Sequence, residues 1–182
     1  GGQNCHESSN YGPHTGFVNS KMLKNAGAQF VIIGHSENRQ NGESDKLINH
    51  KIKSALNAKL KVIFCIGETL TEKRKKKTKS ILSRQIKIGL DKIKYKSKIF
   101  IAYEPVWAIG TGIIPKSEDL VKIIGFIKSK FKNKTPRVLY GGSVSPENIK
   151  NLKKINNIDG FLIGGSSQNT NKFIDIVKKT YS

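Results

Sequence analysis

Five short runs of consecutive apolar, mostly β-branched residues alternate along the chain with longer segments of helical periodicity. The runs are apolar at successive positions rather than at every second position, which is typical of parallel strands covered on both faces. The sequence therefore predicts five buried parallel strands, at Phe30–Ile33, Val62–Ile66, Ile99–Tyr103, Val138–Tyr140 and Phe161–Ile163.

The segments between these runs contain helix start signals followed by apolar residues three or four positions apart. The expected starts are Ser44, Thr71 before a long Lys-rich helix, Ser117 with Glu118 and Asp119, Ser145 before Pro146, and Asn169 or Thr170. A helical turn is expected at Ser36 as well. The chain is therefore of the α/β class.

Strand and helix alternation leaves two architectures, an open doubly wound sheet or a closed (β/α)8 barrel. The open sheet that binds a dinucleotide carries a GxGxxG pattern, and none follows these runs. Polar or glycine-rich residues follow nearly every run instead, at the strand ends where a barrel builds its active site. These are Gly34–Glu37, Gly67–Glu68, Glu104–Pro105, Gly141–Ser143 and Gly164–Ser166.

Glu104 ends the third run and is the candidate general base. A strand-end Glu is more often a member of an ion pair, but the segment Pro105–Gly112 follows at once. Its rigid proline, apolar centre and two glycines are typical of a lid that excludes water.

His35 ends the first run, directly before the expected turn at Ser36. A neutral imidazole there could donate a hydrogen bond to a substrate carbonyl, and a purely structural histidine is the equally weighted alternative. His50, in the middle of a predicted helix, is expected at the surface.

Glycine pairs follow the last two runs, as Gly141-Gly142-Ser143 and Gly164-Gly165-Ser166. Barrels often place a phosphate site after their last two strands, where bare N–H groups approach an anion closely. The two pairs together predict a phosphate grip.

Lys and Arg number 33 against 13 Asp and Glu, a formal charge of +20. This charge draws anionic ligands and permits non-specific nucleic-acid binding. The basic segment Thr71–Lys79 lacks interleaved aromatic residues, so we expect a solvated helix face and no specific nucleic-acid partner.

The two cysteines, Cys5 and Cys65, lie far apart and outside any metal-binding spacing, so neither a metal site nor a disulfide is expected. A reducing cytoplasm fits this usage. No segment is apolar enough for a membrane span.

Several motifs resemble those of the triosephosphate isomerase family. The similar segments are collinear: Val31–Glu37, Gly42–Asp45, Cys65–Glu68, Ala102–Gly112, Tyr140–Val144 and Asp159–Gly165. The resemblance implies a single TIM-barrel domain over residues 1–182, here without the first two strand–helix units and most of strand three. The family's Asn-x-Lys segment is therefore not in this chain, so no catalytic Lys is assigned, and we expect these residues alone to be inactive.

The resemblance also implies site roles. Glu104 would move a proton between C1 and C2 of dihydroxyacetone phosphate, and His35 would polarise the carbonyl. Gly110, Ser143, Gly164 and Gly165 would hold the phosphate through N–H groups, with no metal or organic cofactor. A homodimer is implied for the complete protein, through a loop resembling Tyr11–Gly16 with Thr15 at its tip. The alternatives are another phosphate-binding barrel enzyme and, less favoured, a basic nucleic-acid-binding module.

Overall fold

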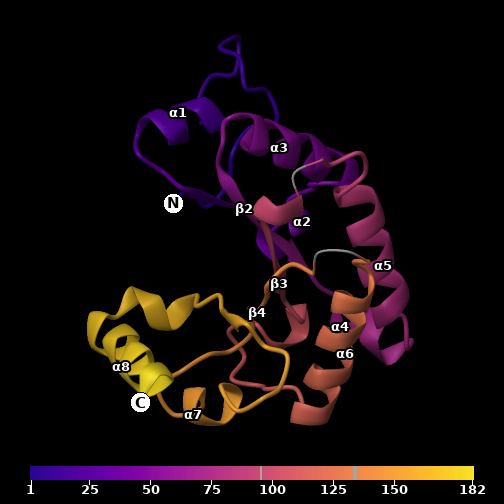
Figure 1. Ribbon diagram of the computed structural model, residues 1–182, viewed down its shortest axis with the longest axis vertical. Helices are drawn as coiled ribbons and strands as arrows, with labels where there is room; N and C mark the ends of the chain where they lie inside the picture. Colours follow the sequence, from indigo (N-terminus) through magenta and orange to yellow (C-terminus); the bar gives the residue numbers. More distant parts are fainter. Residues whose placement is uncertain (95, 133–134) are drawn as a thin grey trace. The chain divides into compact units, whose positions relative to one another are not determined.

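The computed structural model of the chain describes residues 1–94, 96–132 and 135–182 (Figure 1). Two compact units can be distinguished, one of residues 1–66 and 82–101 and the other of residues 67–81 and 102–182. The strands follow the order β1-β2-β3-β4-β5 in one sheet. The strand β3 (Ile99–Tyr103) passes from the first unit into the second.

The first unit is built on the parallel pair β1 (Phe30–Ile33) and β2 (Lys61–Ile66), in which Val31 is opposite Val62 and Ile33 is opposite Phe64. These four side chains are fully buried. The unit also contains α1 (Ser20–Asn25), α2 (Ser36–Gln40), α3 (Asp45–Asn57), most of α5 (Thr78–Gly89) and the 3₁₀ turn η1 (Lys96–Lys98).

Helix α3 packs its apolar face on β1 and β2. The side chain of Ser44 accepts a hydrogen bond from the Leu47 N–H, so the expected cap at Ser44 is confirmed. Ile48, Ile52 and Ala55 follow at helical spacing and are fully buried, whereas His50 lies on the exposed side of the helix, as expected.

The second unit contains β4 (Val138–Tyr140) and β5 (Gly160–Phe161), which pair in parallel. Its helices are α4 (Leu70–Arg74), α6 (Ser117–Ser129), α7 (Ile149–Leu152) and α8 (Thr170–Tyr181), with 3₁₀ turns η2 (Val106–Ala108) and η3 (Gly165–Gln168). Helix α6 packs on β4 and buries Leu120, Ile124 and Ile127. Helices α7 and α8 lie side by side near the C-terminus (Figure 1).

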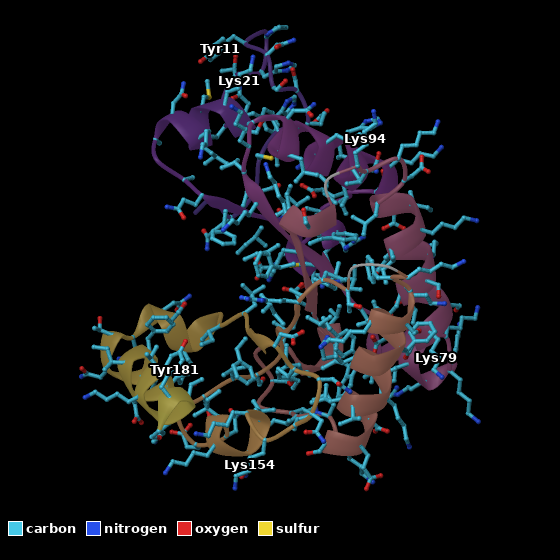
Figure 2. All side chains as sticks on the ribbon, viewed as in Figure 1. Tyr11, Lys21, Lys79, Lys94, Lys154 and Tyr181 are labelled. Carbon is cyan, nitrogen blue, oxygen red and sulfur yellow. The ribbon has the colours of Figure 1, made fainter. Side chains whose placement is uncertain are left out.

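The long helix expected from Thr71 is interrupted. Thr69, not Thr71, caps α4, and its side chain and that of Glu72 bond each other's backbone N–H groups in a capping box. The helix ends at Arg74, Lys76 takes a left-handed φ of 54°, and α5 starts at Thr78. The basic segment is nevertheless mostly exposed, as expected. Lys79, labelled in Figure 2, has its ammonium 5.4 Å from the centroid of the Phe126 ring in α6.

Further boundaries differ from expectation. Strand β5 stops at Phe161 instead of Ile163, because its partner β4 ends at Tyr140 and offers no further ladder. Helix α7 begins at Ile149, since the residues after Ser145 form a turn first. Ser117 is the first residue of α6 rather than a side-chain cap. Helix α8 starts after Asn169, whose side chain accepts from the Lys172 N–H.

Both cysteines are buried thiols that form no disulfide with each other. Burial raises the pKa of the Cys5 thiol to about 11, so it stays protonated at neutral pH. Within the described part of the chain, no helix is both long and apolar enough to cross a membrane.

Candidate functional site

Glu104 follows β3 directly and is 2% exposed. Two glycines make room for it in the second unit. A β-carbon at Gly67 would lie 1.7 Å from the Glu104 carbonyl oxygen, and one at Gly141 would lie 2.9 Å from Glu104 Cγ. Gly141 also donates its N–H to the Tyr103 carbonyl oxygen at 2.9 Å. Glu104 is therefore tightly packed against Gly67 and Gly141 at the carboxyl end of β3.

The segment expected to form a lid, Pro105–Gly112, directly follows Glu104. Pro105 leads into the single turn η2, and Gly110 and Gly112 adopt left-handed φ angles of 68° and 76°. L side chains rarely adopt this conformation, so the two glycines are required by the backbone. Residues from Gly110 to Ile114 are exposed.

Glu68 fastens the start of this lid and was noted in the sequence only as a strand-end residue. Its buried carboxylate accepts hydrogen bonds from the Tyr103 hydroxyl at 3.2 Å and from the Trp107 indole N–H at 2.9 Å. Burial raises the pKa of Glu68, and these hydrogen bonds oppose the rise. In the sequence, only the position of Glu68 shortly after β2 indicated a possible role.

Ser143 connects the lid to the end of β4. Its N–H donates to the Ala108 carbonyl oxygen at 3.1 Å, and its hydroxyl donates to the same oxygen at 2.7 Å. The hydroxyl also accepts from the Gly112 N–H at 3.0 Å. The N–H group expected to hold a phosphate is thus bonded to the lid in this conformation.

Gly164 and Gly165 follow β5 and are exposed, at the entry to η3. A β-carbon at either position would have no heavy atom within 4 Å, so an incoming group can reach this backbone. The hydroxyl of Ser166 donates to the Val144 carbonyl oxygen at 2.7 Å. This bond joins the loops that follow β4 and β5, the two loops that carry the glycine pairs.

Tyr140, at the end of β4, is fully buried, and its hydroxyl has no hydrogen-bond partner among the residues that the structure describes. Burial raises the pKa of this phenol to about 12. A β-carbon at Gly142 would lie 2.1 Å from the hydroxyl oxygen. Packing against Tyr140 therefore requires a glycine at position 142. The sequence pattern predicted a phosphate-binding role for this glycine pair and did not indicate this packing role.

His35 belongs to the first unit, where it caps α2. Its Nδ1 accepts a hydrogen bond from the Glu37 N–H at 3.4 Å, and its side chain is 26% exposed. In a neutral ring with this bond, the proton lies on Nε2, and that nitrogen is the hydrogen-bond donor. The same Nδ1 also lies 3.9 Å from a carboxylate oxygen of Glu37.

Arg39 fixes the turn that carries His35. Its guanidinium donates to the Gly34 carbonyl oxygen at 2.8 Å, to the Cys65 carbonyl oxygen at 3.1 Å and to Asp45 Oδ1 at 2.7 Å. Gly34 is left-handed, and a β-carbon there would lie 3.2 Å from the same Cys65 oxygen. The end of β1 is thereby tied to the end of β2.

The expected site residues are thus divided between the units. Glu104, Gly110, Ser143, Gly164 and Gly165 lie in the second unit, and His35 lies in the first. No group of three or more His, Cys, Asp or Glu residues suited to a metal ion occurs among the described residues. Within the second unit, a buried carboxylate that directly follows a strand is a group suited to taking up a proton.

Comparison with known proteins identifies related sequences. The family model described as triosephosphate isomerase matches residues 1–180. The chain is 47% identical over 176 residues to a triosephosphate isomerase of Thermodesulfovibrio yellowstonii, covering 93% of this chain and 72% of that protein. It is 44% identical over 176 residues to one of Mycoplasmopsis pulmonis, covering 96% and 70%.

Among solved structures, the triosephosphate isomerase of Bartonella henselae is similar with a TM-score of 0.90 and 39% identity, over 100% of this chain and 76% of that one. Together with the parallel strand order, this similarity confirms the expected fold class, a partial (β/α)8 barrel.

Proposed function

The chain belongs to the triosephosphate isomerase family, and we propose that it interconverts dihydroxyacetone phosphate and glyceraldehyde 3-phosphate by proton transfer through an enediolate. The observation that carries the proposal is the family match over residues 1–180, with Glu104 buried at the end of β3 and a lid directly after it. The alternatives, another phosphate-binding barrel enzyme and a nucleic-acid-binding module, are not favoured.

Glu104 is the base in this proposal. Its carboxylate removes a proton from C1 of dihydroxyacetone phosphate and returns it at C2. The close packing of Gly67 and Gly141 around Glu104 supports the role, because a proton is transferred efficiently only when the base is held in place.

His35 polarises the substrate oxygens. The Glu37 N–H on Nδ1 leaves the ring proton on Nε2, and this proton can be donated to the carbonyl and then to the enediolate oxygen. A neutral donor stabilises the developing charge and does not need to be protonated beforehand.

The phosphate is bound by N–H groups of Gly110, Ser143, Gly164 and Gly165. The Ser143 N–H, now bonded to Ala108, becomes available to the anion when the lid moves. Phosphate binding and lid movement are then coupled, because both use the same N–H group. Neither a metal nor an organic cofactor takes part in this scheme.

The proposal extends to assembly and location. We place residues 1–182 in a single domain that forms a homodimer in the complete protein, through the loop 11–16. In this loop Tyr11 is 70% exposed, and the neighbouring Phe17 is 63% exposed. Apolar side chains at such exposure suit an interface. Two buried thiols that form no disulfide with each other fit a reducing cytoplasm.

The test uses the complete gene product in deuterated water and follows exchange at C1 of dihydroxyacetone phosphate by NMR. We expect Glu104→Gln to slow exchange by about 10²- to 10⁴-fold, since it removes the base. Glu147→Gln, which changes an exposed carboxylate, is the matched control and should not affect the rate. Full exchange in Glu104→Gln would contradict the assignment of the base. Absence of C1 exchange in the unaltered protein would favour another phosphate-binding barrel enzyme.

A further inference from the structure

Trp107 lies in the first turn of the lid and is contacted by two polar side chains from residues 67–74. Glu68 Oε1 accepts its indole N–H at 2.9 Å. The Lys73 ammonium lies over the ring face, 3.2 Å from the ring centroid. One group therefore holds the edge of the indole and the other holds its face.

The geometry at Lys73 is that of a cation–π contact, in which an ammonium is attracted to the negative face of an aromatic ring. Lys73 is exposed, so the contact is not imposed by burial. The same ammonium also favours the charged form of the Glu68 carboxyl, which accepts the indole N–H. The two contacts on Trp107 thus support each other.

The backbone that presents Lys73 is itself fixed to the base of the lid. The Glu68 carbonyl oxygen accepts the Val106 N–H at 3.1 Å, and Gly67 packs against the backbone of Glu104. The Thr69 capping box then starts α4, which places Lys73 in the last turn of that helix. Lys73 therefore acts from a fixed position.

We propose that Lys73 is a positioning residue of the lid, which holds Trp107 through its ring face and so stabilises the lid conformation seen here. The neighbouring lysines of the basic segment, such as Lys77, share its charge and exposure but are not required for this effect. The inference rests on the proposed function, because the lid matters only if residues 105–112 close over a substrate.

The consequence is an effect on how readily the lid leaves the conformation seen here, which a general surface charge would not produce. Removal of the ammonium should reduce the stability of this lid conformation relative to others. The expected reduction is the free energy of one exposed cation–π contact. That contact corresponds to about a two- to fivefold change in an equilibrium constant.

The test measures hydrogen–deuterium exchange at the amides of Ala108 and Gly112, which donate to Pro105 and to the Ser143 hydroxyl. Lys73→Met keeps the apolar stem and removes the charge, so exchange at both amides should rise about two- to fivefold. Lys73→Arg should restore protection. Lys77→Met, the matched control, should leave exchange unchanged.

A double variant separates the ring contact from other effects of Lys73. In a Trp107→Leu background, Lys73→Met should add no further exchange, because the ring is gone. Trp107 is the only tryptophan of the chain, so its fluorescence anisotropy reports ring mobility and should fall in Lys73→Met alone.

Equal exchange and anisotropy in Lys73→Met and the unaltered protein would overturn the proposal. So would an equal rise in the Trp107→Leu background. Neither measurement involves turnover, so a failure of the isomerase proposal would appear in the C1 exchange experiment and not here.

Discussion

The backbone of Gly67 lies against the backbone of Glu104, so closely that a β-carbon at Gly67 would stand 1.7 Å from the Glu104 carbonyl oxygen. Gly67 follows β2 and Glu104 follows β3, so this contact joins the ends of two neighbouring strands. The position of the candidate base therefore depends on the absence of a side chain one strand away.

Gly67→Ala should destabilise the protein and displace Glu104. The obstructing atom is backbone, which cannot rotate away, so we expect a loss of about 1–3 kcal/mol or more in the free energy of unfolding. Gly125→Ala is the control, since a β-carbon at this position in α6 meets nothing within 4 Å. It should gain about 0.5–1 kcal/mol through helix propensity. Urea unfolding measures both changes, and equal effects of the two variants would contradict the packing argument.

The environment of Glu68 predicts a dependence of stability on pH. Burial raises its pKa above the ordinary value of 4.5 in the native state only. Between 4.5 and the raised value the native state holds a proton that the unfolded state has lost, so the contribution of Glu68 to stability falls as pH rises.

Urea unfolding at a series of pH values, compared between the unaltered protein and Glu68→Gln, isolates this contribution. The variant should lack the decline that begins above pH 4.5. Parallel stability curves for the two proteins would show that Glu68 does not cause it.

Arg39→Lys should weaken the turn that carries His35. A lysine cannot reproduce the three bonds of the guanidinium to Gly34, Asp45 and Cys65. We expect a loss of about 1.5–3 kcal/mol in the free energy of unfolding. Arg84→Lys is the control, since Arg84 contacts the same Asp45 but is 54% exposed. It should change stability by less than about 0.5 kcal/mol. A cost for Arg39→Lys as small as that of the control would refute the account.

Gly142→Ala should be destabilising through its clash with the Tyr140 hydroxyl, by about 1–3 kcal/mol. Tyr140→Phe removes that hydroxyl together with a buried polar group that lacks a partner in the described chain, so alone it should be neutral or stabilising. The double variant should therefore recover most of the loss. The measurement is thermal or urea unfolding of all four proteins, and strictly additive changes would argue against a direct contact.

Local patterns predicted the strands and several helix starts well. Strands β1 to β4 appear at the expected apolar runs, and Ser44 and Asn169 cap helices as expected. The break between α4 and α5 was not predicted, because lysine and arginine are good helix formers and give no stop signal. The early end of β5 depends on its partner strand, which periodicity cannot show.

The sequence by itself determined which residues are buried strand and which follow at their carboxyl ends, because apolar runs and turn residues act through neighbours along the chain. It therefore identified His35, Glu104 and the glycine pairs as candidates. Only the tertiary structure decided that Gly67 and Gly141 make room for Glu104, that Arg39 fixes the His35 turn, and that Glu68 and Lys73 hold Trp107. These contacts join residues far apart in the chain, and steric fit and hydrogen-bond geometry exist only once the backbone has brought them together.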